Sequence, residues 1–177
     1  MSTADVVVRP RRPDDVPVLV EVLAAQQPGS RYPMRWPLPF PVERFLVRGT
    51  EEAAWVAELD GRVVGHVAVC SVPDPEAFGV PGDMVSVAVL FVDLAVRGTG
   101  TGGLLLDTAV AWAHEHERVP VLDVVPRHSR AIAVYRHRGW VEVGRVRPDW
   151  LPVDEDDVVL MTLPPGPVES GGRAVPA

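Results

Sequence analysis

The sequence lacks the features that mark secreted, disulfide-stabilised and membrane-spanning proteins. Its 177 residues include one cysteine, Cys70, so no disulfide can form within the chain. No apolar run approaches the ~18 residues that a membrane span needs. The opening residues also lack the basic-then-apolar layout of a signal peptide. We therefore expect a soluble, cytoplasmic protein with no membrane partner.

Lysine and asparagine are absent as well. All 17 strongly basic residues are arginine, and the 24 acidic residues give a net charge of −7, which argues against a nucleic-acid partner. The preference for Arg, Ala, Val, Pro and Gly is typical of a GC-rich coding source, and we expect a bacterial origin. No metal site is predicted.

The length of the chain suits a single domain. Hydrophobic residues make up 47% of the sequence, which is enough for a substantial core. We expect one domain over residues 1–163. A tail rich in proline and glycine follows at 164–177, and its composition predicts disorder.

Apolar periodicity and turn residues predict a mixed α/β sheet with helices packed on it. Asp60-Gly61 separates two β-rich runs and predicts a tight hairpin. A helix that begins after Asp15 is expected to end near Gln27, because Pro28 follows. Strands are predicted at residues 6–9, 53–59, 62–72, 85–94, 119–125, 140–146 and 157–163, and helices at 16–27, 42–48, 102–117 and 129–138.

The most informative segment lies between a predicted strand and a predicted helix. It consists of Arg97, Gly98, Thr99, Gly100, Thr101, Gly102 and Gly103. Glycines let backbone N–H groups approach an anion, and a helix N-terminus favours negative charge. Arg97 adds a bidentate donor. The segment predicts a phosphate-binding loop, but not a Walker A loop, since no Lys-Ser/Thr pair follows.

Two other interpretations of this loop stay open at this point. Residues 98–103 match Gly-x-Gly-x-x-Gly, and Asp123 lies 20 residues beyond Gly103, as in dinucleotide-binding proteins. Too little chain follows Gly103 for the further βα units that such a domain needs, and the preceding hairpin has no place in it. The segment could also be a glycine turn without a ligand.

Two motifs together resemble the GCN5-related N-acetyltransferases. The first is Arg-x-x-Gly-x-Gly, present from Arg97 to Gly102 and followed by two leucines. The second is Ala-x-x-x-Tyr-x-x-x-Gly-Trp, present from Ala131 to Trp140. The resemblance spans residues 6–163. It implies a mostly antiparallel sheet of about seven strands flanked by about four helices. It also implies transfer of an acetyl group from acetyl-CoA to a primary amine of a small molecule or a peptide N-terminus.

The resemblance further implies roles for individual residues at the acetyl-CoA site. The backbone of Leu90, Phe91 and Val92 would meet the pantetheine arm, and residues 97–103 would hold the pyrophosphate. Tyr135 would protonate the departing thiolate. His128 stands where the family often has an asparagine that touches the pantetheine arm, so we expect it to contact the cofactor as well.

The general base is assigned to Asp123, the one acid in an otherwise apolar run. The resemblance aligns it with a glutamate that some protein N-terminal acetyltransferases use as a base. A lone acid in a buried strand is costly unless it is paired or functional. Glu58 and His66, on the predicted hairpin, are rival bases, and deprotonation through water is a further alternative.

The sequence leaves the acceptor open. Loops 31–40 and 147–157 are expected to wall the acceptor site, and an amino acid, an antibiotic, a polyamine and a protein N-terminus all remain candidates. The arginines near the cofactor half suit the phosphates of CoA; they are Arg97, Arg127, Arg130, Arg136 and Arg138. A homodimer is expected from the family. A non-catalytic acyl-CoA-binding module and a nucleotide-binding oxidoreductase are the alternative functions.

Overall fold

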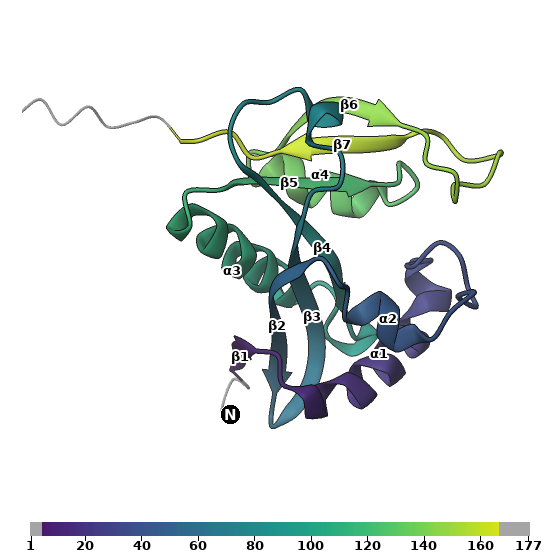
Figure 1. The fold of residues 1–177 in the computed structure, drawn as a ribbon. Helices are drawn as coiled ribbons and strands as arrows, with labels where there is room; N and C mark the ends of the chain where they lie inside the picture. The colour runs from purple at the N-terminus through teal and green to yellow at the C-terminus, as the bar shows by residue number, and fades with distance from the viewer. Residues whose placement is uncertain (1–4, 167–177) are drawn as a thin grey trace, which may run out of the picture.

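A seven-stranded sheet organises residues 5–166, the part of the chain that this computed structural model describes (Figure 1). The strands lie in the order β1-β2-β3-β4-β5-β7-β6, and β4 and β5 are the one parallel pair in the described part. They are β1 (Val6–Pro10), β2 (Glu51–Leu59), β3 (Arg62–Ser71), β4 (Met84–Val92), β5 (Val119–Val124), β6 (Val141–Val146) and β7 (Val158–Thr162). The predicted mixed, mostly antiparallel sheet is confirmed. Most of the expected tail, residues 167–177, lies outside the described residues.

This topology decides between two of the interpretations of the glycine loop. A dinucleotide-binding domain needs a doubly wound, mostly parallel sheet. Here the strand before the loop has an antiparallel neighbour on one side and a single parallel neighbour on the other. The glycine loop therefore belongs to a different architecture.

Helices cover both faces of the sheet (Figure 1). α1 (Val16–Ser30) and α2 (Val42–Leu46) pack on one face, and α3 (Thr101–Glu115) and α4 (Ser129–His137) pack on the other. Leu23 and Leu46 are fully buried under the first pair, and Leu105 and Leu106 under the second. Each such leucine contributes about 1.5–3 kcal/mol. No helix of residues 5–166 is long and apolar enough to cross a membrane.

The predicted end of α1 near Gln27 is wrong, because the helix continues through Pro28 to Ser30. Proline removes one backbone hydrogen bond, but side chains stabilise this last turn. Gln26 Nε2 donates to the carbonyl of Tyr32 at 2.5 Å, and Gln27 Nε2 donates to that of Pro33 at 3.1 Å. Both glutamines are buried. The last turn of α1 is thus tied to the loop that follows it.

β4 contains one residue more than its neighbour β3 can match. His66 pairs with Phe91 and Ala68 pairs with Ala88, so Val67 faces two residues, Val89 and Leu90. This is a β-bulge, which bends the strand and shifts its alternation. Val89 has a φ of 53°, in the left-handed region that β-branched residues avoid. That conformation costs roughly 1–2 kcal/mol and needs support from its surroundings.

The support comes from His66, whose side chain is fully buried beside the bulge. Its Nδ1 lies 2.8 Å from the carbonyl oxygen of Val89, and its Nε2 lies 3.1 Å from Nη1 of Arg11. A carbonyl can only accept and a guanidinium can only donate, so the neutral ring carries its proton on Nδ1. Arg11 is in turn held by Glu51 through two hydrogen bonds of 2.6 and 2.9 Å.

Just before the bulge, β4 separates from β5. Their pairing ends at Ser86 and Val121, although β4 continues to Val92 and β5 to Val124. On its other side β5 stays paired with β7 as far as Val124. We call the unpaired stretch between the two strands the β4–β5 opening. It leaves backbone donors and acceptors of β4 free to bind another extended chain.

We expect the free energy of unfolding to decrease as the pH falls from about 6.5 to about 4. Burial lowers the pKa of His66 to about 4, so in this window the ring takes up a proton only when the protein unfolds. The unfolded state then binds more protons, and stability rises with pH by on the order of 3 kcal/mol across the window. Urea unfolding at stepped pH measures it.

The variant His66→Gln isolates this contribution, since glutamine can donate and accept hydrogen bonds but does not titrate. Its loss of stability toward pH 4 should be smaller than that of the wild type. His114→Gln, at an exposed site on α3, is the matched control and should keep the wild-type slope. Equal slopes for His66→Gln and the wild type would contradict the assignment.

Candidate functional site

The glycine loop leads from β4 into α3 and exposes backbone donors. Gly98 and Gly100 have φ values of 80° and 91°, which favour glycine, and a Cβ at either would meet nothing within 4 Å. No side chain caps α3. Among the described residues, no backbone carbonyl accepts from the N–H groups of Thr101, Gly102 and Gly103. These N–H groups and the helix dipole favour an anion.

Two threonines fix the shape of this loop. Thr99 Oγ1 donates to the carbonyl of Val96 at 2.7 Å and lies 2.8 Å from Thr101 Oγ1, which is buried. Because the hydroxyls bind within the loop, the N–H groups at the start of α3 stay free. The loop therefore fits the pyrophosphate of acetyl-CoA in its donors and in its open surroundings.

Arg138 covers the first turn of α3. A Cβ at Gly103 would displace its guanidinium, so the absence of a side chain there lets Arg138 lie against the helix start. Arg138 Nε also binds Asp107 at 3.0 Å. Of the other predicted arginines, Arg127 pairs with Glu155, and Arg136 lies 3.7 Å from Glu142. Arg97 and Arg130 are exposed, and neither has a carboxylate within 4.0 Å among residues 5–166.

Asp123 lies close enough to Tyr135 to influence the ionisation of the phenol. Tyr135 is half-buried on α4, its ring 6.0 Å from that of Trp140, and burial and the nearby Asp123 raise its pKa to about 12. Solvent reaches Asp123, yet surrounding protein raises its pKa through desolvation, while the charge of Arg48 opposes the rise. Access combined with desolvation is typical of a side chain at an opening. The structure therefore brings the predicted acid and base together.

Tyr32 joins these two residues from the loop after α1. Burial raises its pKa, and Asp123 and Tyr135 add to the rise. Its ring packs edge-on against Phe45 at 5.8 Å and against His128 at 6.2 Å. Loop 31–40, β5 and α4 therefore converge, as expected for one wall of the acceptor site.

His128 directly precedes α4 and faces Tyr32. Its Nε2 is buried, and no hydrogen-bond partner lies within reach among the described residues. Burial lowers the pKa of the ring, so it is neutral at physiological pH. A neutral histidine with an unused ring nitrogen can donate or accept one hydrogen bond, which is the capacity that the predicted pantetheine contact requires.

The structure places the two rival bases elsewhere. Glu58 binds Arg9 Nε at 2.8 Å on the β1–β2 side of the sheet. His66 is fully buried and uses both ring nitrogens at the β4 bulge. Glu58 is therefore held in an ion pair on another part of the sheet, and His66 has no ring nitrogen free to accept a proton.

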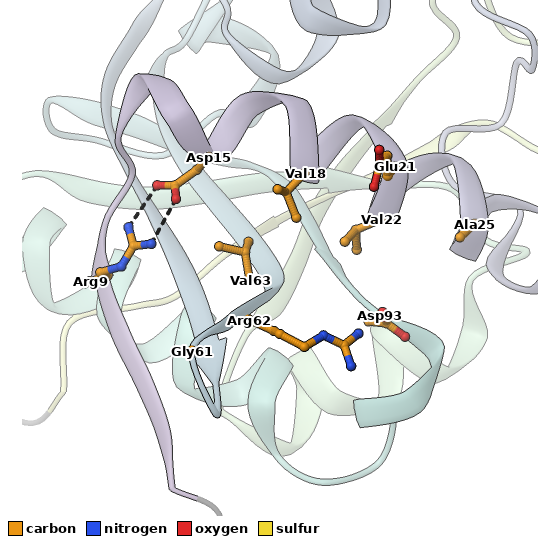
Figure 2. Close-up of a pocket in the computed structure, with 10 residues that line it drawn as sticks. All are labelled: Arg9, Asp15, Val18, Glu21, Val22, Ala25, Gly61, Arg62, Val63 and Asp93. Atoms are coloured by element: carbon orange, nitrogen blue, oxygen red, sulfur yellow. Dashed lines mark hydrogen bonds and ion pairs between the residues drawn. The ribbon is translucent and has the colours of Figure 1, made fainter.

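A hollow of about 510 Å³ lies between α1 and the β2–β3 turn (Figure 2). In it Arg9 is bound to Asp15, and Glu21 and Asp93 add further negative charge beside Arg62. Apolar walls with a few convergent polar groups are the usual mark of a ligand pocket. This hollow has mixed, partly paired charge and contains neither Asp123, Tyr135 nor the glycine loop, so we assign it no function.

Solved structures with the same fold are acetyltransferases. The ribosomal-protein-S18-alanine N-acetyltransferase of Escherichia coli superposes with a TM-score of 0.67 at 16% identity, over 98% of this chain and all of that one. NAA60 of Arabidopsis thaliana in complex with acetyl-CoA superposes with a TM-score of 0.68 at 19% identity, over 89% of this chain and 97% of that one. A Corynebacterium glutamicum structure described as histone acetyltransferase HPA2 and related acetyltransferase superposes with a TM-score of 0.66 at 23% identity. The superposition covers 91% of this chain and 97% of that one.

No curated protein matches the chain by sequence. The model of the acetyltransferase (GNAT) family does match it, over residues 20–140. That match includes the bulged strand, the glycine loop, Asp123 and the whole Ala131–Trp140 motif. This chain belongs to the GNAT acetyltransferase family.

Proposed function

We propose that the protein is an acetyl-CoA-dependent N-acetyltransferase. The acetyl group passes to a primary amine by direct attack within a ternary complex. Family membership supports acyl transfer, and two structures with the same fold contain acetyl-CoA or a bisubstrate analogue, CoA-Ac-MVNAL. We take residues 1–163 as one acetyltransferase domain.

One observation carries the proposal: an acid and a base stand together beside the β4–β5 opening, with the glycine loop at its end. Asp123 lies two residues beyond Val121, the last residue of β5 that pairs with β4, and its charge raises the pKa of Tyr135 on α4. The glycine loop begins five residues after Val92, the last residue of β4. A donor that starts at the loop and extends along β4 would bring its reactive end to this pair.

The chain's own groups would bind acetyl-CoA, which supplies an activated acetyl group when bound. The N–H groups of residues 98–103 would hold the pyrophosphate, with Arg97 beside them. The backbone of Leu90, Phe91 and Val92 would pair with the amides of the pantetheine arm, since β5 does not occupy this side of the strand. The unused ring nitrogen of His128 would contact the same arm.

Asp123 would take the proton that an ammonium group must lose before it can attack. Its raised pKa makes it a stronger base than an ordinary aspartate. The amine nitrogen then forms a bond to the acetyl carbon, and the carbon–sulfur bond breaks. Tyr135 would give its phenolic proton to the departing sulfur, and the second proton that the nitrogen loses on becoming an amide would return to the phenolate through solvent. The products are then an amide and the free thiol of CoA. A pKa of about 12 keeps Tyr135 protonated and ready for this step.

Thiol release from acetyl-CoA, measured against amines, amino acids and peptides, tests the function. We expect at least one class of acceptor to give steady release above the rate with no acceptor. Protection from thermal unfolding by CoA, measured in parallel, reports binding. Binding without release for any acceptor would instead identify a non-catalytic acyl-CoA-binding module.

Tyr135→Phe should lower kcat by about 10²-fold or more, because the leaving sulfur loses its proton donor. KM for acetyl-CoA should change little. Since the pKa of Tyr135 is about 12, the wild-type rate should show no alkaline loss up to about pH 10.5. His137→Ala, at an exposed site on the same helix, is the control. A fully active Tyr135→Phe would exclude this role.

Asp123→Asn should remove the acidic limb of the kcat/KM profile. The wild-type rate rises with pH as the carboxyl ionises, and its midpoint should lie above the ordinary aspartate value because burial raises the pKa. The same variant should be more stable than the wild type at pH 7. The ionised carboxylate costs stability above its raised folded pKa, and asparagine carries no charge.

Asp74→Asn, in the exposed loop between β3 and β4, serves as the matched control for both measurements. It should change neither the pH profile nor the free energy of unfolding. An unchanged acidic limb in Asp123→Asn would assign proton removal to water or to another group.

A further inference from the structure

Arg48 is a half-buried cation without an acidic partner. Four arginines of residues 5–166 are half-buried, and three of them form close ion pairs. Arg9 binds Asp15 at 2.8 Å, Arg11 binds Glu51 at 2.6 Å, and Arg118 binds Glu52 at 2.9 Å. The fourth, Arg48, has no carboxylate within 4.0 Å in this part of the chain.

Aromatic contacts place Arg48 on the acceptor side of the site. It stands just after α2, with its guanidinium carbon 5.0 Å from the ring centroid of Phe45. Its Nε donates to the carbonyl of Phe45 at 3.4 Å. The Phe45 ring packs edge-on against Tyr32, which meets His128. Arg48 thus belongs to the same wall as Tyr32.

The strand register directs Asp123 toward that wall. Side chains two residues apart on a strand point to the same face, so Asp123 shares the face of Val121. Its neighbours Leu122 and Val124 point to the opposite face of the sheet, where they pack under α3 and α4. Asp123 therefore faces the side of α1 and α2. In agreement, the charge of Arg48 lowers the pKa of both Asp123 and Tyr32.

We propose that Arg48 binds the carboxylate of the acceptor, and that the acceptor is a free α-amino acid. This inference rests on the proposed function. A guanidinium binds a carboxylate through two parallel hydrogen bonds, and its stacking on Phe45 fixes its direction. The same acceptor places its amine at Asp123 and Tyr135. A peptide N-terminus carries a neutral amide at this position and leaves Arg48 uncompensated.

A carboxylate matches the charge of this wall better than a phosphate does. Arg31 and Arg35 in the same wall are exposed to water, so Arg48 is its half-buried guanidinium. One guanidinium balances one negative charge, whereas a phosphate monoester carries up to two at neutral pH. An amine without an anionic group would leave a half-buried cation unpaired in the complex, which is costly. A free amino acid supplies one positive group for Asp123 and one negative group for Arg48.

Thiol release from acetyl-CoA is measured with a panel of α-amino acids and with the amide of each. We expect the acid to exceed its amide in kcat/KM by about 10- to 100-fold, the range for losing a hydrogen bond to a charged group. Arg48→Gln should raise KM for the acid, leave kcat nearly unchanged and abolish the preference over the amide. Arg48→Lys should restore part of it.

Arg44→Gln, at an exposed site on α2, is the matched control and should keep the wild-type preference. The comparison of acid with amide on the wild-type protein needs no variant, so it stays decisive if Arg48→Gln folds poorly. Equal use of acids and amides, or release with peptides and simple amines only, overturns the inference and leaves the proposed function intact. If no acceptor of any class gives thiol release, both the inference and the proposed function are overturned.

Discussion

The hydrogen bond from buried His66 to the carbonyl of Val89 is the interaction on which the site depends. It holds one extra residue in β4, and after that residue the side chains of β4 alternate between the two faces of the sheet in the opposite phase. Val85 and Val87 pack under α3 before the bulge, whereas Leu90 and Val92 do so after it. A strand that changes face in this way bends away from its straight neighbour. The separation from β5 begins three residues before Val89, after the pair of Ser86 with Val121.

Support for this bulge comes from elements far apart in the sequence. Arg11, just after β1, donates to His66 and is bound by Glu51 at the start of β2, so two further strands hold the ring in place. Desolvation keeps the imidazole neutral, which leaves one nitrogen as a donor and the other as an acceptor. An unsupported carbonyl and a left-handed valine would each cost more than 1 kcal/mol in a buried strand. The family's cofactor chemistry thus rests here on a polar chain that touches neither proposed substrate.

Local signals in the sequence were sufficient to predict most helices and strands and the glycine loop, but not the bulge in β4. Asp60-Gly61 predicts the hairpin, and the glycines at residues 98–103 predict the exposed N–H groups. The bulge has no such signal, because residues 87–92 are apolar throughout and a change of face leaves no trace in an all-apolar run. The helix end predicted from Pro28 is wrong, because the buried side chains of Gln26 and Gln27 stabilise a further helical turn that proline alone would end. His66 is a rival base by its residue type, whereas its burial and its two hydrogen-bond partners give it a structural place beside the bulge.

The distribution of charge around the β4–β5 opening divides the site into two halves with different requirements. At the glycine loop, free N–H groups with Arg97 and Arg138 nearby form a positive region within a chain whose net charge is −7. Such a region suits a donor with several negative charges, and water-exposed arginines can serve it because phosphates remain partly hydrated. On the opposite wall, among the described residues, Arg48 is the one half-buried arginine; Asp123 is the acid of β5, and aromatic rings lie on the same wall. Two opposite charges on a partly desolvated wall distinguish acceptors by the positions of their charged groups rather than by their total charge. Each charged group of the acceptor must meet its partner on the protein at a fixed distance. If the proposed roles hold, the donor half would select for charge, and the acceptor half would select for the spacing of two opposite charges in one small molecule.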